Sequence, residues 1–282
     1  MISIIVPTYN RAKLIHRSLD SIMNQTSSDW ECLIIDDYSN DNTKQVVQSY
    51  INNDNRFSYH LNERRKGAQG ARNTGIMKAK GEYVCFFDSD DFMYPNYIDL
   101  VCHKIKENNN KIILTYGQMI DERTSEKMEV MKNIDDGNLH IKLLRGGAYV
   151  AYNMAVIPID DVRRIGFLDE KCPSHQELET HIRLSKYCQY SVVPEILWNY
   201  YVGRDDMISS NIEKHLEGLI YIMRKHSYQY RLYAYQNFLV RARRLWDKLN
   251  DTPDIKIKYR RQLLFIAPEL PLLLLKRKLL NQ

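Results

Sequence analysis

The sequence has few cysteines, no cysteine-pair motif and no long apolar segment. Its five cysteines include no Cys-x-x-Cys arrangement, so we expect a reducing compartment, with neither a disulfide framework nor a zinc site. No apolar run approaches the ~20 residues that cross a bilayer, and the first residues lack the features of a secretory signal. We therefore expect a cytoplasmic protein that does not span a membrane.

Three glycine-dependent motifs are absent as well. Residues 66–73 contain two glycines but match neither the Gly-x-Gly-x-x-Gly fingerprint nor the Walker pattern. An EF-hand that began at Asp88 would need glycine at its sixth position, where the chain has Met93. The sequence therefore argues against a dinucleotide fold, a kinase-type P-loop and an EF-hand.

Positive charge is concentrated near the end of the chain. The net charge is +5, yet residues 221–282 hold 14 Lys and Arg against 4 Asp and Glu. Basic and apolar residues alternate there on predicted helices, which suits an element that lies on an anionic leaflet. A helical appendage that completes the core or forms a dimer contact explains the pattern equally well. Nucleic-acid binding is not expected, because no RNA- or DNA-binding module accompanies the charge.

Apolar runs alternate with helix-like segments through the first part of the chain. Helical periodicity is clear in residues 11–25, whereas residues 121–136 are polar and predict a surface excursion. The alternation implies right-handed crossovers and a mostly parallel sheet with helices on both faces. The predicted strands are residues 2–6, 30–35, 57–61, 83–87 and 112–116.

Acidic side chains follow two of these strands. Asp88-Ser89-Asp90 comes directly after one apolar strand, and Asp36-Asp37 ends another. Parallel sheets bind ligands at the carboxyl ends of their strands, so we expect both segments to face one crevice. Two carboxylates there can approach one Mg²⁺ or Mn²⁺ ion, which would neutralise a diphosphate leaving group. A solvated acidic turn is the alternative for Asp88 and Asp90.

The pair Asp36-Asp37 and the glycine-containing loop supply further candidate ligands. One of the two carboxylates could accept a hydrogen bond from the N3–H of a uracil ring, while the other caps the following turn. In the loop, Lys66 and Arg72 add positive charge suited to a pyrophosphate, and the glycines permit close backbone approach. A loop without a ligand is the alternative.

Four segments resemble motifs of the family 2 glycosyltransferases, in the family's order and spacing. They are VPTYN at residues 6–10, IIDDYSND at 34–41, GARNTGI at 70–76 and FDSDD at 87–91. The resemblance covers residues 1 to about 95. It implies a Rossmann-like GT-A fold, a nucleoside-diphosphate-sugar donor and an inverting mechanism. Tyr38 departs from the pattern, because glycine or asparagine is commoner there.

The resemblance also implies roles for individual residues. Asp37 matches the aspartate that reads the base, Arg72 the basic residue near the donor, and Asp88 and Asp90 the metal-binding pair. With the loop lysine included, the expected contacts of the nucleotide sugar are Pro7, Thr8, Tyr9, Asp37, Lys66, Arg72, Asp88 and Ser89.

An inverting transfer needs a general base, which is worth ~10²–10⁴-fold in rate. Family members often carry a Glu-Asp pair before a helix that ends in Arg-Leu and is followed by Pro-Glu. Gln176-Glu177 stands at that position, ahead of Arg183-Leu184 and Pro194-Glu195, so the resemblance implies that Glu177 is the base. Glu179 and then His175 are the next candidates. A helix-terminal carboxylate stabilised by the dipole is the alternative.

We therefore expect a transferase that moves a sugar, most simply from a UDP-sugar with Mn²⁺ or Mg²⁺, to a saccharide or lipid-linked saccharide in cell-surface polysaccharide synthesis. The GT-A domain should span residues 1–210, with a nucleotide-sugar half (1–110), an acceptor half (111–210) and a basic helical extension (211–282). The extension would lie at the cytoplasmic face of the membrane or form a homo-oligomer. A nucleotidyltransferase and a non-catalytic sugar-nucleotide- or glycan-binding module are the alternatives.

Overall fold

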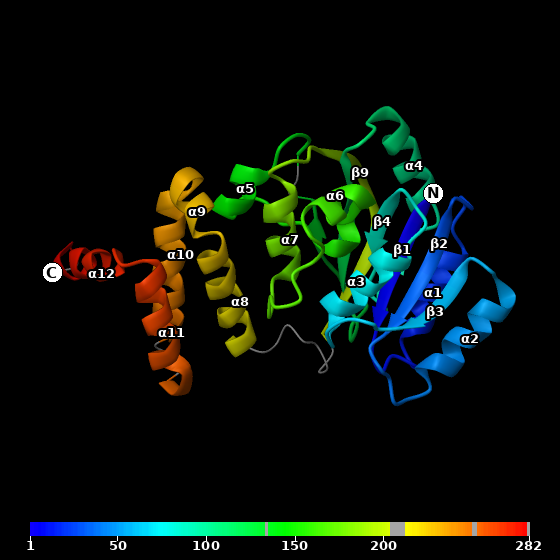
Figure 1. The fold of residues 1–282 in the computed structure, drawn as a ribbon, viewed down its shortest axis with the longest axis horizontal. Coiled ribbons are helices and arrows are strands. Elements are labelled where there is room, and N and C mark those ends of the chain that lie inside the picture. The colour runs from blue at the N-terminus through cyan, green and yellow to red at the C-terminus, as the bar shows by residue number, and fades with distance from the viewer. Residues whose placement is uncertain (133–134, 204–211, 250–252, 281–282) are drawn as a thin grey trace. The chain divides into compact units, whose positions relative to one another are not determined.

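The computed structural model describes residues 1–132, 135–203, 212–249 and 253–280 (Figure 1). The chain forms two compact units. The sheet unit consists of Met1–Leu139, Val150–Glu170 and Arg183–Met207. The helical unit consists of His140–Tyr149, Lys171–Ile182 and Ile208–Gln282.

One mixed sheet forms the centre of the sheet unit. Its strands are β1 (Ile2–Thr8), β2 (Trp30–Asp36), β3 (Phe57–Leu61), β4 (Tyr83–Phe86), β5 (Phe92–Met93), β6 (Ile112–Asp121), β7 (Lys127–Met131), β8 (Ala155–Pro158) and β9 (Tyr190–Val202). The spatial order is β3-β2-β1-β4-β8-β6-β9-β5, and β7 pairs with β6. The first four strands are parallel, as predicted, whereas β8 runs antiparallel to β4 and β6.

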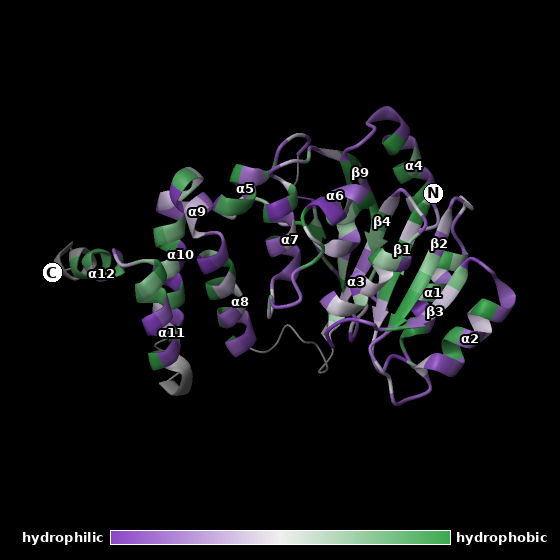
Figure 2. Ribbon diagram, viewed as in Figure 1, coloured by the Kyte–Doolittle hydropathy of each residue, from purple (hydrophilic) through white to green (hydrophobic). Residues whose placement is uncertain are grey.

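The strands are buried because their apolar side chains form the core. Ile4, Ile5, Ile34, Ile35 and Phe86 are fully buried, and Figure 2 shows the apolar colour concentrated along β1 and β2. Burying each such side chain contributes about 1.5–3 kcal/mol. The α/β fold class is confirmed by this sheet and its flanking helices.

Helices connect the strands of the sheet unit. They are α1 (Ile15–Met23), α2 (Thr43–Asn53), α3 (Ala68–Lys78), α4 (Tyr97–Glu107) and α6 (Ile159–Arg164), with a 3₁₀ turn at Tyr152–Met154. On α1, Ile15, Leu19 and Ile22 are buried, as the periodicity predicts. Helix α3 packs on β1 and β2 and buries eight of its 11 residues.

The helical unit contains the remaining helices. They are α5 (His140–Arg145), α7 (Gln176–Leu184), α8 (Ile212–Lys225), α9 (Ser227–Tyr233), α10 (Tyr235–Lys248), α11 (Pro253–Ile266) and α12 (Leu270–Leu280). The last two residues of α7 belong to the sheet unit. Along the described chain, every helix is too short or too polar to span a bilayer. The predicted division into residues 1–210 and 211–282 stays a prediction. In the structure, α5 and most of α7 group with the C-terminal helices.

Candidate functional site

The ends of three parallel strands lie at one edge of the sheet. Thr8 of β1 is opposite Asp36 of β2, and Ile5 of β1 is opposite Phe86 of β4. Because these strands run in the same direction, the residues that follow them emerge at the same edge, where such sheets bind ligands. The acidic segments after β2 and β4 therefore lie at one edge of the sheet unit.

Arg72 connects helix α3 to the acidic segment after β4. Its Nη2 atom donates to Asp88 Oδ1 at 2.9 Å, and its Nη1 atom donates to Gln69 Oε1 at 3.1 Å. The guanidinium lies 4.4 Å from the Tyr152 ring centroid, and the Tyr152 hydroxyl accepts a hydrogen bond from Gln69. The arginine is buried, whereas the Asp88 side chain is 38% exposed. Arg72 is thus held rigidly while Asp88 remains open to solvent.

Asp37 contacts the chain immediately before the same helix. Its Oδ2 atom accepts the Gly67 backbone N–H at 2.8 Å, and its Oδ1 atom accepts the Asn62 side-chain amide at 2.7 Å. Gly67 precedes the first residue of α3. Asp37 and Asp88 therefore both contact the beginning of α3, one at Gly67 and the other at Arg72.

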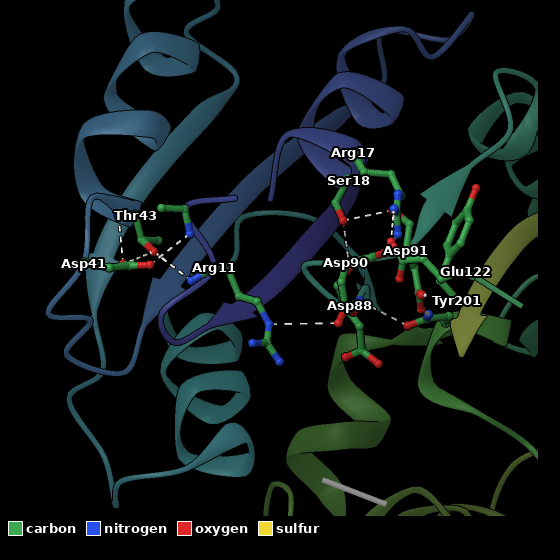
Figure 3. Close-up of polar contacts among 12 residues, drawn as sticks. Arg11, Arg17, Ser18, Asp41, Thr43, Asp88, Asp90, Asp91, Glu122 and Tyr201 are labelled. Atoms are coloured by element: carbon green, nitrogen blue, oxygen red, sulfur yellow. Dashed lines mark hydrogen bonds and ion pairs between the residues drawn. The ribbon is translucent and has the colours of Figure 1, made fainter. Parts of the chain in front are cut away.

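Two arginines from the chain after β1 contact Asp90 (Figure 3). Arg11 Nε lies 3.9 Å from Asp90 Oδ2, and Arg17 donates to the Asp90 backbone carbonyl at 2.9 Å. Arg17 also pairs with Glu122 at the end of β6 and lies 3.8 Å from the Tyr201 ring centroid of β9. The acidic segment is therefore fixed from β1, β6 and β9 together.

The neighbouring carboxylate of Asp91 is fully buried and has a different environment. It accepts hydrogen bonds from the Asn153 side chain and from the Tyr201 backbone N–H. Burial raises its pKa well above the ordinary value, and the charges of Asp88 and Asp90 raise it further. Asp91 therefore holds the acidic turn in place and is not exposed to a ligand.

Asp36 has the structural role that the sequence left open between it and Asp37. Asp36 Oδ1 accepts the Ser39 backbone N–H and hydroxyl, and Oδ2 accepts the Tyr59 hydroxyl at 2.6 Å. Tyr38, which lies between Asp37 and Ser39, has φ of 65° and is 58% exposed. This left-handed backbone explains why glycine or asparagine suits the position.

The other residues predicted to contact the nucleotide sugar include both exposed and buried side chains. Tyr9 is 45% exposed, and Lys66 Nζ lies 5.2 Å from its ring centroid. Pro7 is half-buried, while Thr8 and Ser89 are buried. In the part of the chain that the structure describes, Thr8 Oγ1 and Arg72 Nε are buried without a hydrogen-bond partner. Buried polar atoms are normally paired, so these two fit a polar ligand.

Asp88 and Asp90 resemble a partial cation site, in which two carboxylates supply only some of the ligands. The Asp90 side chain is 16% exposed and Asp88 is more open, and Arg72 engages only one oxygen of Asp88. Over the described residues, no group of three or more His, Cys, Asp or Glu side chains could hold a metal. Mg²⁺ is commonly bound by one or two carboxylates plus substrate phosphates and waters, and this donor set matches that pattern.

The candidates for the general base lie in the helical unit. Glu177 is partly exposed in the first turn of α7. Glu179 is fully buried, and its Oε1 atom lies 2.7 Å from Lys225 Nζ and 3.2 Å from His226 Nε2. His175 shares a hydrogen bond with His215, and burial, followed by His215 and by Arg241 and Lys248, lowers its pKa to about 4. Because Glu179 is fully buried and its Oε1 atom contacts Lys225 and His226, it is poorly placed to accept a proton from a ligand.

Sequence reasoning missed several residues that shape the site. Arg11 directly follows the first motif and carries a charge that could have marked it. Arg17, Glu122 and Tyr201 gave no such signal, because only the sheet topology brings β6 and β9 to the acidic segment. Tyr152 was hidden for a similar reason, because the fold brings it to Arg72 from a distant part of the chain.

Comparison with known proteins identifies the family of the chain. Residues 3–156, more than half of the chain, match the family model described as Glycosyl transferase family 2. The poly(ribitol-phosphate) beta-N-acetylglucosaminyltransferase TarP of Staphylococcus aureus is 32% identical over 221 residues, which is 74% of this chain and 64% of TarP. The Escherichia coli UDP-Glc:alpha-D-GlcNAc-diphosphoundecaprenol beta-1,3-glucosyltransferase WfgD is 39% identical over 117 residues, which is 42% of this chain and 45% of WfgD.

A solved structure supports the fold. The S. aureus TarS 1-349 complex with UDP-GlcNAc superposes with a TM-score of 0.67 at 20% identity, covering 78% of this chain and 65% of that one. The chain spans less than two thirds of the length of the curated relatives named above. The motif-bearing edge of the sheet lies almost wholly within the matched segment 3–156. The chain therefore belongs to glycosyl transferase family 2.

Proposed function

We propose that this protein transfers a sugar from a UDP-sugar, with inversion, to a hydroxyl of a saccharide or lipid-linked saccharide in cell-surface polysaccharide synthesis. One observation carries the proposal: Asp37 and Asp88 both contact the beginning of α3, at Gly67 and at Arg72. The proposed base-binding carboxylate and one carboxylate of the proposed diphosphate-binding pair are thereby held by the same helix. The names of TarP, WfgD and the TarS complex support a UDP-linked donor and a glycan or lipid-linked acceptor.

The chemistry follows from where charge develops during the transfer. As the bond between the sugar and the diphosphate breaks, negative charge accumulates on the departing diphosphate. A divalent cation bound to Asp88 and Asp90 would neutralise that charge, as it does in other phosphate-binding sites. Arg72 and Arg11 add fixed positive charge beside the same carboxylates, and positioned charges of this kind stabilise a transition state.

The buried unpartnered atoms find their role in donor binding. In this proposal Thr8 Oγ1 and Arg72 Nε donate hydrogen bonds to the diphosphate of the bound donor. These bonds remove the free-energy cost of burying two polar atoms without partners. The exposed ring of Tyr9, with Lys66 beside it, lies next to the base. Asp37 accepts the N3–H of the base with a carboxylate lone pair that Asn62 and Gly67 leave available.

Inversion requires the acceptor oxygen to attack the anomeric carbon from the side opposite the diphosphate. Glu177 takes the proton from the acceptor hydroxyl as the new C–O bond forms and the bond to the diphosphate breaks. The products are the glycosylated acceptor and UDP, with the proton on the Glu177 carboxylate. A general base of this kind contributes ~10²–10⁴-fold in rate.

The test is UDP release from a panel of UDP-sugars, with and without Mn²⁺ and candidate acceptors. Asp90→Asn should lower transfer at least 100-fold while thermal stability is retained. Asp160→Asn, on an exposed carboxylate of α6 (89% exposed), is the matched control and should transfer normally. Full activity of Asp90→Asn would refute the site, and release of pyrophosphate instead of UDP would indicate a nucleotidyltransferase. Binding of UDP-sugar without turnover under any condition would indicate a non-catalytic binding module.

We also propose that the C-terminal helices hold the protein at the anionic cytoplasmic face of the membrane. Phe265 of α11 is 82% exposed and Leu272 of α12 is 67% exposed, and Arg261 is exposed one turn before Phe265. Exposed apolar side chains with basic neighbours bind anionic lipid surfaces. The double variant Phe265→Ser, Leu272→Ser should lose co-sedimentation with phosphatidylglycerol vesicles. Unchanged sedimentation with loss of a dimer would instead identify a homo-oligomer contact.

A further inference from the structure

Helix α7, which carries Glu177, is fastened to helix α8 of the C-terminal region at three places. The Ser174 hydroxyl just before α7 donates to the Lys214 backbone carbonyl at 2.7 Å. The rings of His175 and His215 share a hydrogen bond of 3.1 Å. Farther along both helices, the Glu179 carboxylate contacts Lys225 at 2.7 Å and His226 at 3.2 Å.

The first two contacts bring the two backbones unusually close. A Cβ atom at Gly218 of α8 would overlap the Ser174 hydroxyl and lie 2.7 Å from the Ser174 carbonyl oxygen. Only glycine lets α8 approach the chain this closely. His175 has φ of 54°, and its carbonyl accepts the Glu179 backbone N–H at 3.1 Å, the first hydrogen bond of α7. The N-terminus of α7 is therefore fixed by residues 214–218 of α8.

The third contact fixes the rotation of α7 about its own axis. Glu179 is fully buried, so its charge must be balanced locally, and Lys225 supplies the opposite charge. Side chains two residues apart on a helix point about 200° away from each other. With Glu179 directed at Lys225 and His226, the side chain of Glu177 is turned away from α8.

We propose that α8 is a positioning element for Glu177, and that Glu179 and Lys225 are the positioning residues that set its direction. The inference rests on the proposed function, in which Glu177 is the general base. It assigns the beginning of the C-terminal extension a part in catalysis rather than in attachment alone. A displacement of about 1 Å in a reacting group can cost roughly 100-fold in rate, so loosening α7 should affect turnover strongly.

The experiment compares transfer kinetics in single variants of the full chain. Lys225→Met and Glu179→Gln should lower kcat at least tenfold, while KM for the UDP-sugar and Kd for UDP stay within about twofold of wild type. Lys225→Arg keeps the positive charge and should restore kcat to within about threefold. Arg224→Met removes an equal charge from an exposed neighbour on α8 and should leave kcat unchanged.

The outcomes separate this inference from the proposed function. If Glu177→Gln abolishes transfer but Lys225→Met keeps wild-type kcat, α8 does not position the base and the inference is overturned. If Lys225→Met lost both kcat and UDP affinity, the inference would likewise be overturned, because a loss of both indicates general unfolding. Wild-type transfer by Glu177→Gln would refute the base assignment itself. Should Glu179→Gln fail to fold, the comparison of Lys225→Met with Lys225→Arg decides alone.

Discussion

Two adjacent aspartates in one turn have different hydrogen-bond partners. Asp36 uses both carboxylate oxygens for Ser39 and Tyr59, and burial together with this carboxylate raises the pKa of the Tyr59 hydroxyl. Asp37 instead accepts from the Gly67 backbone N–H beside α3. The sequence predicted that one aspartate would cap the turn, but it could not say which, because the choice depends on Tyr59 and Gly67.

Tyr38 stands between this pair and Ser39 in a conformation that suits another residue. Its φ of 65° costs a tyrosine about 1–2 kcal/mol, a penalty that asparagine largely avoids. Tyr38→Asn should therefore raise the free energy of unfolding by about 1 kcal/mol, measured by urea denaturation. Tyr187→Asn, at a tyrosine of similar exposure (63%) that is not among the residues with positive φ, should bring no gain. An unchanged or lower stability of Tyr38→Asn would contradict the assigned strain.

At the scale of elements, helix α3 is the support of the candidate donor site. It begins at a close approach, since a Cβ atom at Gly70 would overlap the Arg65 carbonyl oxygen and lie 2.9 Å from its carbon. Glycine was predicted to permit close backbone approach, and at Gly70 the group that approaches is the chain's own Arg65 carbonyl. The segment from Arg65 to Gly67 includes the N–H that Asp37 accepts.

Gly70→Ala should displace this segment and weaken UDP binding. The added methyl group meets backbone rather than a movable side chain, so the loop must shift and Asp37 must lose the Gly67 N–H. We expect at least a tenfold rise in Kd for UDP, measured by calorimetry. Gly147→Ala, where a Cβ would meet nothing closer than 3.8 Å, is the control. Unaltered UDP affinity in Gly70→Ala would show that the loop does not need this geometry.

The contact between α7 and α8 makes the helical unit sensitive to acid. Burial lowers the pKa of His175 to about 4 and also lowers that of His215, and both rings face the cations Arg241 or Lys248. Depressed histidine pKa values contribute stability that is present above pH ~6.5 and is lost as the pH falls toward 4. The free energy of unfolding should fall over that range, and less steeply in His175→Gln. His103→Gln, with an exposed ring (66%), should follow wild type, and parallel curves for all three proteins would refute the account.

Sequence patterns predicted the first half of the sheet closely and the second half poorly. β1 to β4 were recognised because each is a short apolar run bounded by turn residues. β7 lies in a segment that was expected to be a surface excursion because it is polar. Its residues are indeed mostly exposed, yet they form a strand. β9 was not among the predicted strands, and its Pro194 falls where the pairing of β6 with β9 shifts register between Thr115 and Tyr116. A bulge tolerates proline within a strand.

At the scale of the whole molecule, the chain is organised as a sheet unit with the family motifs and a helical unit with the candidate base. Local patterns could place Thr8, Asp37 and Asp88 at the edge of the sheet, since each lies at the end of its strand or just after it. They could not predict that α5 and α7 group with the C-terminal helices, because that depends on contacts such as Ser174 with Lys214 and Glu179 with Lys225. The C-terminal region is thus structurally continuous with the helix that carries Glu177.

The central claim is that Asp37, Arg72 and Asp90 bind one nucleoside diphosphate, with Asp37 at the base and Arg72 and Asp90 at the diphosphate. Calorimetric titration of UDP in the presence of Mn²⁺ tests it most directly, with Asp37→Ala, Arg72→Met and Asp90→Asn compared with wild type and with Asp160→Asn. We predict that each of the three site variants binds UDP at least tenfold more weakly, whereas Asp160→Asn binds normally. Wild-type affinity in all three site variants would contradict the claim.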